Sequence, residues 1–142
     1  MRLRVQVEGS ELSLELPGGG AELVALMSFA VSRGFGATHP LIALADRLHE
    51  KHHVRWGPLT TFYEGEPEDS EDVEKLEMAW QNPAPLRDEL MNLAAAIESD
   101  EQAQTLARRG AAEGVPAQAR ALAEALEPAI SRGQRVRLVY DL

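Results

Sequence analysis

The sequence contains no cysteine, few aromatic residues and no long apolar run. The absence of cysteine excludes disulfides, thiolate nucleophiles and zinc sites built on cysteine. No apolar run approaches the roughly 20 residues that cross a bilayer. The N-terminal residues alternate in polarity, whereas a signal peptide has an unbroken apolar centre. We therefore expect a cytoplasmic protein with no membrane partner.

Basic residues are also scarce, since 14 lysines and arginines stand against 23 acids and give a formal net charge of −9. The imbalance is concentrated between Glu64 and Glu101, where thirteen acids stand against two bases. A surface of this sign repels the phosphates of nucleic acids and of anionic lipids. The charge disfavours nucleic acid as a partner and favours a protein that has a basic surface. Alternatively, the acids only solvate one loop and helix.

The remaining composition is that of an ordinary folded protein. Hydrophobic residues make up 44% and charged residues 26% of the chain, a mix typical of globular proteins. A chain of 142 residues fits one domain. We predict a single α+β domain over residues 1–142, with a solvated acidic loop at about residues 64–71.

Three segments alternate with the period of a β-strand. Their apolar positions are Leu3, Val5 and Val7, then Leu12, Leu14 and Leu16, and near the C-terminus Val136, Leu138 and Tyr140. The first two segments predict a hairpin, with Gly9 at the first central position of a type II′ turn. In that register Val7 lies opposite Leu12.

The C-terminal strand needs a neighbour, because an isolated hairpin is barely stable. Beside the first strand, Arg135 and Arg137 could face Arg2 and Arg4, and like charges opposite one another are destabilising. Beside the second strand, the same two arginines could face glutamates. We therefore predict that residues 135–141 pair with residues 11–16.

Helical spacing of apolar residues dominates the middle of the chain. The predicted helices cover about residues 23–33, 40–52, 70–81, 86–98, 101–109 and 116–132. Together the patterns predict an α+β fold, in which five or six helices cover a small three-stranded, mainly antiparallel sheet. The aromatic-rich residues 54–63 are expected to form a short extended segment packed between sheet and helices, or to line a ligand pocket.

All four histidines fall between positions 39 and 53. On a continuous helix, His49 and His53 lie one turn apart with Asp46 beside them. Two imidazoles and a carboxylate are ligands suited to zinc or iron. Alternatively, histidines near a helix C-terminus only interact with the helix dipole. His52 falls on the apolar side and is expected in or near the core.

No serine lies in a Gly-x-Ser-x-Gly elbow. The carboxylates occupy positions that the hydrophobic pattern places on the surface. The sequence therefore favours a non-enzymatic interaction or regulatory module with no cofactor. Its expected partner is a protein with a basic surface, or a second copy of the chain. The residues expected to bind this partner are the acids Glu64, Glu66, Glu68, Asp69, Glu71 and Asp72. The alternative is a small metal-dependent enzyme that uses Asp46, His49 and His53.

Overall fold

The two terminal strands form the middle of a mixed β-sheet. The computed structural model describes residues 1–11, 16–31 and 39–142. The strands in this part of the chain are β1 (Arg2–Val7), β2 (Ser10–Glu11), β3 (Phe62–Glu64) and β4 (Val136–Asp141). They lie in the order β2-β1-β4-β3, with β1 antiparallel to β2 and β4, and β3 parallel to β4.

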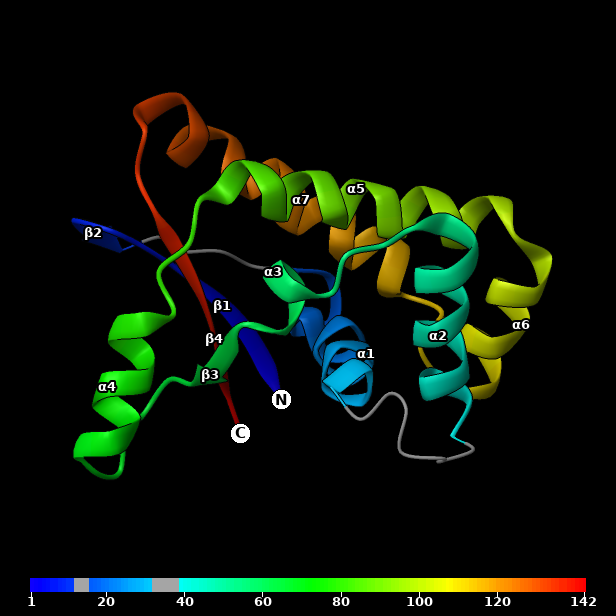
Figure 1. Ribbon diagram of the computed structural model, residues 1–142, viewed down its shortest axis with the longest axis horizontal. Coiled ribbons are helices and arrows are strands. Elements are labelled where there is room, and N and C mark those ends of the chain that lie inside the picture. Colours follow the sequence, from blue (N-terminus) through cyan, green and yellow to red (C-terminus); the bar gives the residue numbers. More distant parts are fainter. Residues whose placement is uncertain (12–15, 32–38) are drawn as a thin grey trace.

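Helices surround this sheet, and the predicted α+β class is confirmed (Figure 1). The helices of the described residues are α1 (Ala21–Val31), α2 (Pro40–His52), α3 (Gly57–Thr60), α4 (Ser70–Met78), α5 (Pro83–Ser99), α6 (Glu101–Arg109) and α7 (Val115–Arg132). A 3₁₀ turn at Pro17–Gly20 precedes α1. Within the described parts of the chain, no helix is both long and apolar enough to span a bilayer.

The main core lies between one face of the sheet and the longer helices. Leu3 and Val5 of β1 and Leu138 of β4 belong to it. The helices contribute the leucines that their spacing predicted, among them Leu23, Leu44, Leu48, Leu86, Leu90, Leu93 and Leu122, all fully buried. Each such side chain contributes about 1.5–3 kcal/mol on burial. The helical stripes therefore hold the helices against the sheet.

Helix α4 lies apart from the other helices, across the sheet (Figure 1). Because successive side chains of a strand point to opposite faces, Arg137 lies on the other side of β4 from the core residue Leu138. Its guanidinium contacts the α4 region, with Nη1 donating to the carbonyl oxygen of Leu76 at 2.8 Å. Leu76 is the one buried residue of α4. Val73, on the same helix, is exposed.

The predicted partner of the C-terminal strand is wrong. Strand β4 pairs with β1, from Arg2 opposite Asp141 to Val7 opposite Val136, and with β3 on its other side. Residues 12–15 of the predicted partner lie outside the described residues. The expected repulsion does not arise, because the antiparallel register separates the arginines. Arg4 lies opposite Val139 and forms an ion pair with Asp141, with Nε to Oδ2 at 2.6 Å.

The hairpin register also differs from the expected one. Val7 lies opposite Ser10, so the two-residue loop is Glu8-Gly9, and the predicted pairing of Val7 with Leu12 is wrong. Gly9 still supplies the positive φ (81°), from the second position of the loop. Leu12 and Leu14 lie outside the described residues.

The sheet gains a strand that the three-strand prediction lacked. Residues 62–64 of the aromatic segment form β3, which lies parallel to β4 with Phe62 opposite Leu138. The sheet is therefore mixed, with two of its three strand pairings antiparallel, as the prediction of a mainly antiparallel sheet requires. Strand β3 ends at Glu64. The residues that follow are acids interrupted by Gly65 and Pro67, and they form a loop up to α4.

Candidate functional site

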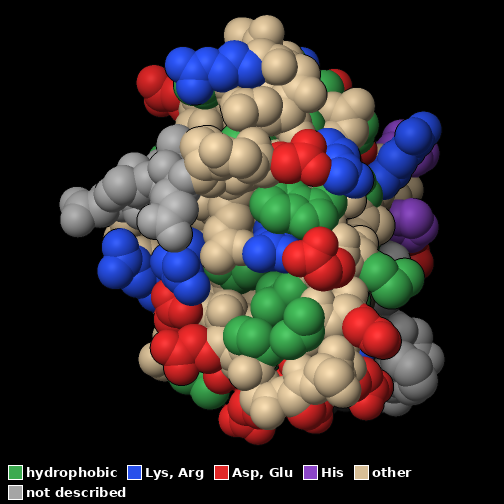
Figure 2. All heavy atoms as spheres, turned by 90° about the vertical axis from the view of Figure 1, so that its left-hand side faces the viewer, with side chains coloured by type: hydrophobic (Ala, Val, Ile, Leu, Met, Phe, Trp, Pro, Cys, Tyr) green, Lys and Arg blue, Asp and Glu red, His purple; other side chains and the backbone are tan. Residues whose placement is uncertain are grey.

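The acidic residues 64–72, here called the acidic segment, run from the end of β3 into the first turn of α4. Glu66, Glu68, Asp69 and Glu71 are exposed, whereas Glu64 and Asp72 are half-buried. Figure 2 looks onto the side of the molecule that carries α4, and acidic side chains gather in its lower half. The fold thus presents these acids together on one surface.

Two acids of this segment shape its backbone. Asp69 is the N-cap of α4, and its Oδ1 accepts a hydrogen bond from the backbone N–H of Asp72 at 2.9 Å. Asp72 Oδ2 in turn accepts from the backbone N–H of Glu68 at 3.2 Å. Acids in a first helical turn also interact favourably with the helix dipole. Asp69 and Asp72 therefore stabilise the start of α4 in addition to adding charge.

The glutamates of the acidic segment are less engaged. Within the described chain, Glu66 and Glu68 form no ion pair, and Glu71 lies 3.8 Å from Lys75 Nζ. That pair is exposed on both sides, and exposed pairs of this kind contribute little to stability. Glu66, Glu68 and Glu71 therefore contribute little to the stability of the fold, and their side chains are exposed to solvent.

A groove of about 380 Å³ lies beside β3. Its walls come from α1, β3, α4 and β4, and it includes Glu64 and Asp72 of the acidic segment. The rings of Phe62 and Tyr140 meet edge to face there, with their centroids 5.8 Å apart. Sequence reasoning allowed that residues 54–63 line a pocket, and Phe62 and Tyr63 do line this one.

The residues proposed for a metal site do not converge. Helix α2 ends at His52, and His53 takes a left-handed conformation (φ 56°) at its C-cap, so the helical path that would align it with His49 ends one residue early. His49 Nδ1 lies 3.0 Å from the carbonyl oxygen of Val54. Among the described residues, no three histidine or acidic side chains form a group that could hold a metal ion. The expected set of Asp46, His49 and His53 therefore has no geometric support.

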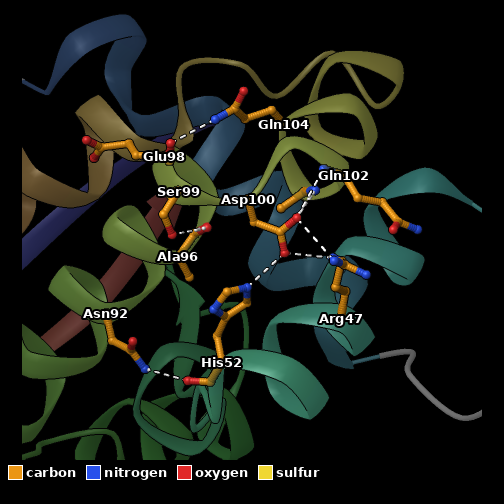
Figure 3. A network of polar contacts seen from close by, with 10 residues as sticks. Arg47, His52, Asn92, Ala96, Glu98, Ser99, Asp100, Gln102 and Gln104 are labelled. Atoms are coloured by element: carbon orange, nitrogen blue, oxygen red, sulfur yellow. Dashed lines mark hydrogen bonds and ion pairs between the residues drawn. The ribbon is translucent and has the colours of Figure 1, made fainter.

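A different polar cluster surrounds Asp100, at the junction of α5 and α6 (Figure 3). Asp100 Oδ2 accepts hydrogen bonds from Arg47 Nε at 2.7 Å and pairs with His52 Nε2 at 2.8 Å. Its Oδ1 accepts from the backbone N–H groups of Gln102 and Ala103 at 3.0 and 3.2 Å. His52, expected in or near the core, thus lies partly exposed against this carboxylate.

This environment holds Asp100 in its charged form. The hydrogen bonds from Arg47, and secondarily that from His52, hold the pKa of the Asp100 carboxyl well below its usual range. A carboxylate whose oxygens are all engaged is a poor proton acceptor at neutral pH. The cluster therefore joins α2 to the start of α6 and is a structural feature. The sequence gave no sign of the contact between Asp100 and α2.

Comparison with protein-family models, with curated proteins and with solved structures gives no match for this chain.

Proposed function

We propose that this chain is a non-enzymatic interaction module that binds a protein with a basic surface through the acidic segment. The observation that carries the proposal is the exposure of Glu66, Glu68 and Glu71 on one surface. Of these three, only Glu71 forms an ion pair within the described chain, with Lys75. Carboxylates in this arrangement attract a cationic surface from a distance and accelerate encounter. The expected setting is the cytoplasm.

A different protein fits this surface better than a second copy of the chain. In a symmetric dimer each contact patch meets the same patch of its partner. An acidic segment close to the two-fold axis would then face its own copy, and like charges placed together are unfavourable. A net charge of −9 adds to this repulsion. Nucleic acid is disfavoured by the same charge.

The proposal is tested with an oligolysine peptide as a defined basic probe. The variant Glu66→Gln, Glu68→Gln, Glu71→Gln spares the capping residue Asp69 and should leave the fold intact. Exposed charge pairs contribute roughly 0.3–0.5 kcal/mol each, so we expect binding to weaken about 5–10-fold at low salt. Calorimetric titration at ionic strengths of about 0.05 and 0.3 M should show a steep loss of affinity, because salt screens exposed charges.

A matched variant separates a local site from the effect of total charge. Glu50, Glu113 and Glu124 are equally exposed but lie on α2, before α7 and on α7. Their replacement by glutamine changes the net charge by the same amount. We expect this control to bind the peptide nearly as well as the unaltered protein. Equal weakening by both triple variants would show that only the overall charge matters, and would contradict the proposal.

A further inference from the structure

The groove beside β3 combines apolar walls with carboxylates. Val31 at the end of α1 is 60% exposed and Tyr63 is 37% exposed, although both are large hydrophobic side chains. Phe62 and Tyr140 add two half-buried rings. Apolar surface left open to water is a site where an incoming apolar group gains free energy. The groove therefore offers apolar contacts as well as charged ones.

The charged part of the groove is acidic. Glu64 from β3 and Asp72 from α4 line it together with Lys75. The Lys75 ammonium lies 3.8 Å from Glu71 Oε1, and Glu71 is not part of the groove lining. The lining therefore has an excess of negative charge, and the acidic segment around it adds more. This charge selects a cationic occupant.

We propose that the groove binds an arginine side chain of the protein partner, an inference that rests on the proposed function and specifies its central contact. An arginine has an apolar stem and a charged end, which matches the two kinds of wall. Its planar guanidinium stacks on aromatic rings and bonds carboxylates with a fixed fork of donors. A lysine ammonium is a compact, strongly hydrated charge that fits the aromatic walls less well.

The opposite face of the sheet from Phe62 and Tyr140 already holds one arginine in a similar way. The guanidinium carbon of Arg137 lies 4.3 Å from the centroid of the Trp80 ring. Its Nε donates to Gln6 Oε1 at 2.6 Å, and its Nη1 to the Leu76 carbonyl oxygen at 2.8 Å. Between β4 and α4, therefore, a guanidinium is stacked on an aromatic ring and hydrogen-bonded at its edge. The groove presents aromatic rings and oxygen acceptors for a second one.

The test uses two short peptides that are identical except that one carries arginine and the other citrulline, its uncharged analogue. Titration of ¹⁵N-labelled protein, followed by NMR, should shift the amide signals of residues 62–64 and of Asp72 and Lys75 with the arginine peptide. Tyr63→Ala and Glu64→Gln should each weaken binding at least about fivefold. Met78→Ala is the control, because this side chain is 83% exposed and lies outside the groove lining.

The outcomes distinguish this inference from the proposed function. Shifts confined to the groove, with citrulline inactive, support it. Equal shifts with both peptides would overturn it, since the positive charge would then be irrelevant. Oligolysine binding that depends on the acidic segment, together with no groove shifts from the arginine peptide, would overturn the arginine site alone and leave the proposed function standing. Shifts spread over all acidic surfaces would also overturn it.

Discussion

The carboxylate of Asp100 joins three helices through hydrogen bonds and ion pairs, because it lies at the junction of α5 and α6 and contacts α2. It accepts hydrogen bonds from Arg47 of α2 and from two backbone N–H groups of α6, and it pairs with His52. These contacts lower the pKa of Asp100, so the folded state favours the ionised form of this carboxyl over the protonated form. The stabilisation is present above the unfolded-state pKa of about 3.9, and it is lost as the pH falls further, towards the lowered folded-state pKa.

Asp100→Asn should therefore destabilise the protein in a pH-dependent way. Asparagine still caps α6 but lacks the charge, and hydrogen bonds to charged groups contribute about 1.5–3 kcal/mol. We expect the free energy of unfolding, measured with urea at pH 7, to fall by about 1–3 kcal/mol. The difference from the unaltered protein should shrink below about pH 4, where the native Asp100 loses its advantage.

Asp88→Asn is the matched control for Asp100→Asn. Asp88 pairs with Arg87 on the surface, and 68% of its side chain is exposed. Loss of such a pair should leave the free energy of unfolding nearly unchanged. A difference between Asp100→Asn and the unaltered protein that stayed constant from neutral to acidic pH would contradict the role given to the Asp100 charge.

Among the elements, α4 has the weakest attachment. It buries only Leu76, whereas α5 and α7 each bury seven residues. Arg137 of β4 donates to its Leu76 carbonyl oxygen and stacks on the ring of Trp80, just beyond its end. Segments with few buried apolar contacts open locally at low free-energy cost. The helix in which the acidic segment ends is thus the one that can adjust most readily to a partner.

Arg137→Ala should loosen α4 without unfolding the rest. We expect faster hydrogen exchange of the α4 amides, by about tenfold if one hydrogen bond from a charged donor is lost, and little change in α5 and α7. Arg135→Ala is the control, because Arg135 immediately precedes β4 and its side chain pairs with the exposed Glu8. Equal acceleration across all helices would show that Arg137 supports the whole fold instead.

The helices could be predicted from the sequence because their signals are local. The leucine spacing of α2 or α5 is contained within a few turns, and the buried residues agree with it. The sheet could be predicted only in part. Strand β3 is three residues long, too short for a clear alternation, and its partner lies more than 70 positions away.

The strand register shows why local charge arguments were insufficient. The prediction compared Arg135 and Arg137 with possible neighbours, and each cross-strand pair is worth only about 0.2–1 kcal/mol. Burial of Leu3, Val5 and Leu138 outweighs such differences. The acidic segment was predicted as a solvated run. For the groove, the sequence allowed a pocket at residues 54–63 but could not indicate its other walls, because α1, β3, α4 and β4 meet there only after folding.

For the molecule as a whole, β4 is the central structural element. It lies between β1 and β3 and pairs with both. Deletion of residues 134–142 removes this strand, exposes the apolar face of β1 and leaves β3 without its partner. We expect the shortened chain to lose its cooperative thermal unfolding transition, followed by circular dichroism or calorimetry.

Deletion of Leu142 alone provides the comparison for the larger truncation. Leu142 is 88% exposed and lies beyond β4, so its removal should barely change the transition. A chain ending at residue 133 that still unfolded cooperatively would show that the helices form a stable unit without the sheet. The sheet would then be an appendage and not part of one core.

The pairing of β1 with β4 also has a consequence for synthesis of the protein. Arg4 and Asp141, which form an ion pair across these strands, are 137 positions apart in the sequence. During translation β1 leaves the ribosome early, but its central partner follows only after all the helices have emerged. Until β4 has been synthesised, the apolar side chains of β1 lack their strand partner. Unpaired strands and exposed apolar surface make a nascent chain prone to aggregation, which chaperones counteract. Because such long-range pairing is slow to form, completion of the sheet should be a late step in folding.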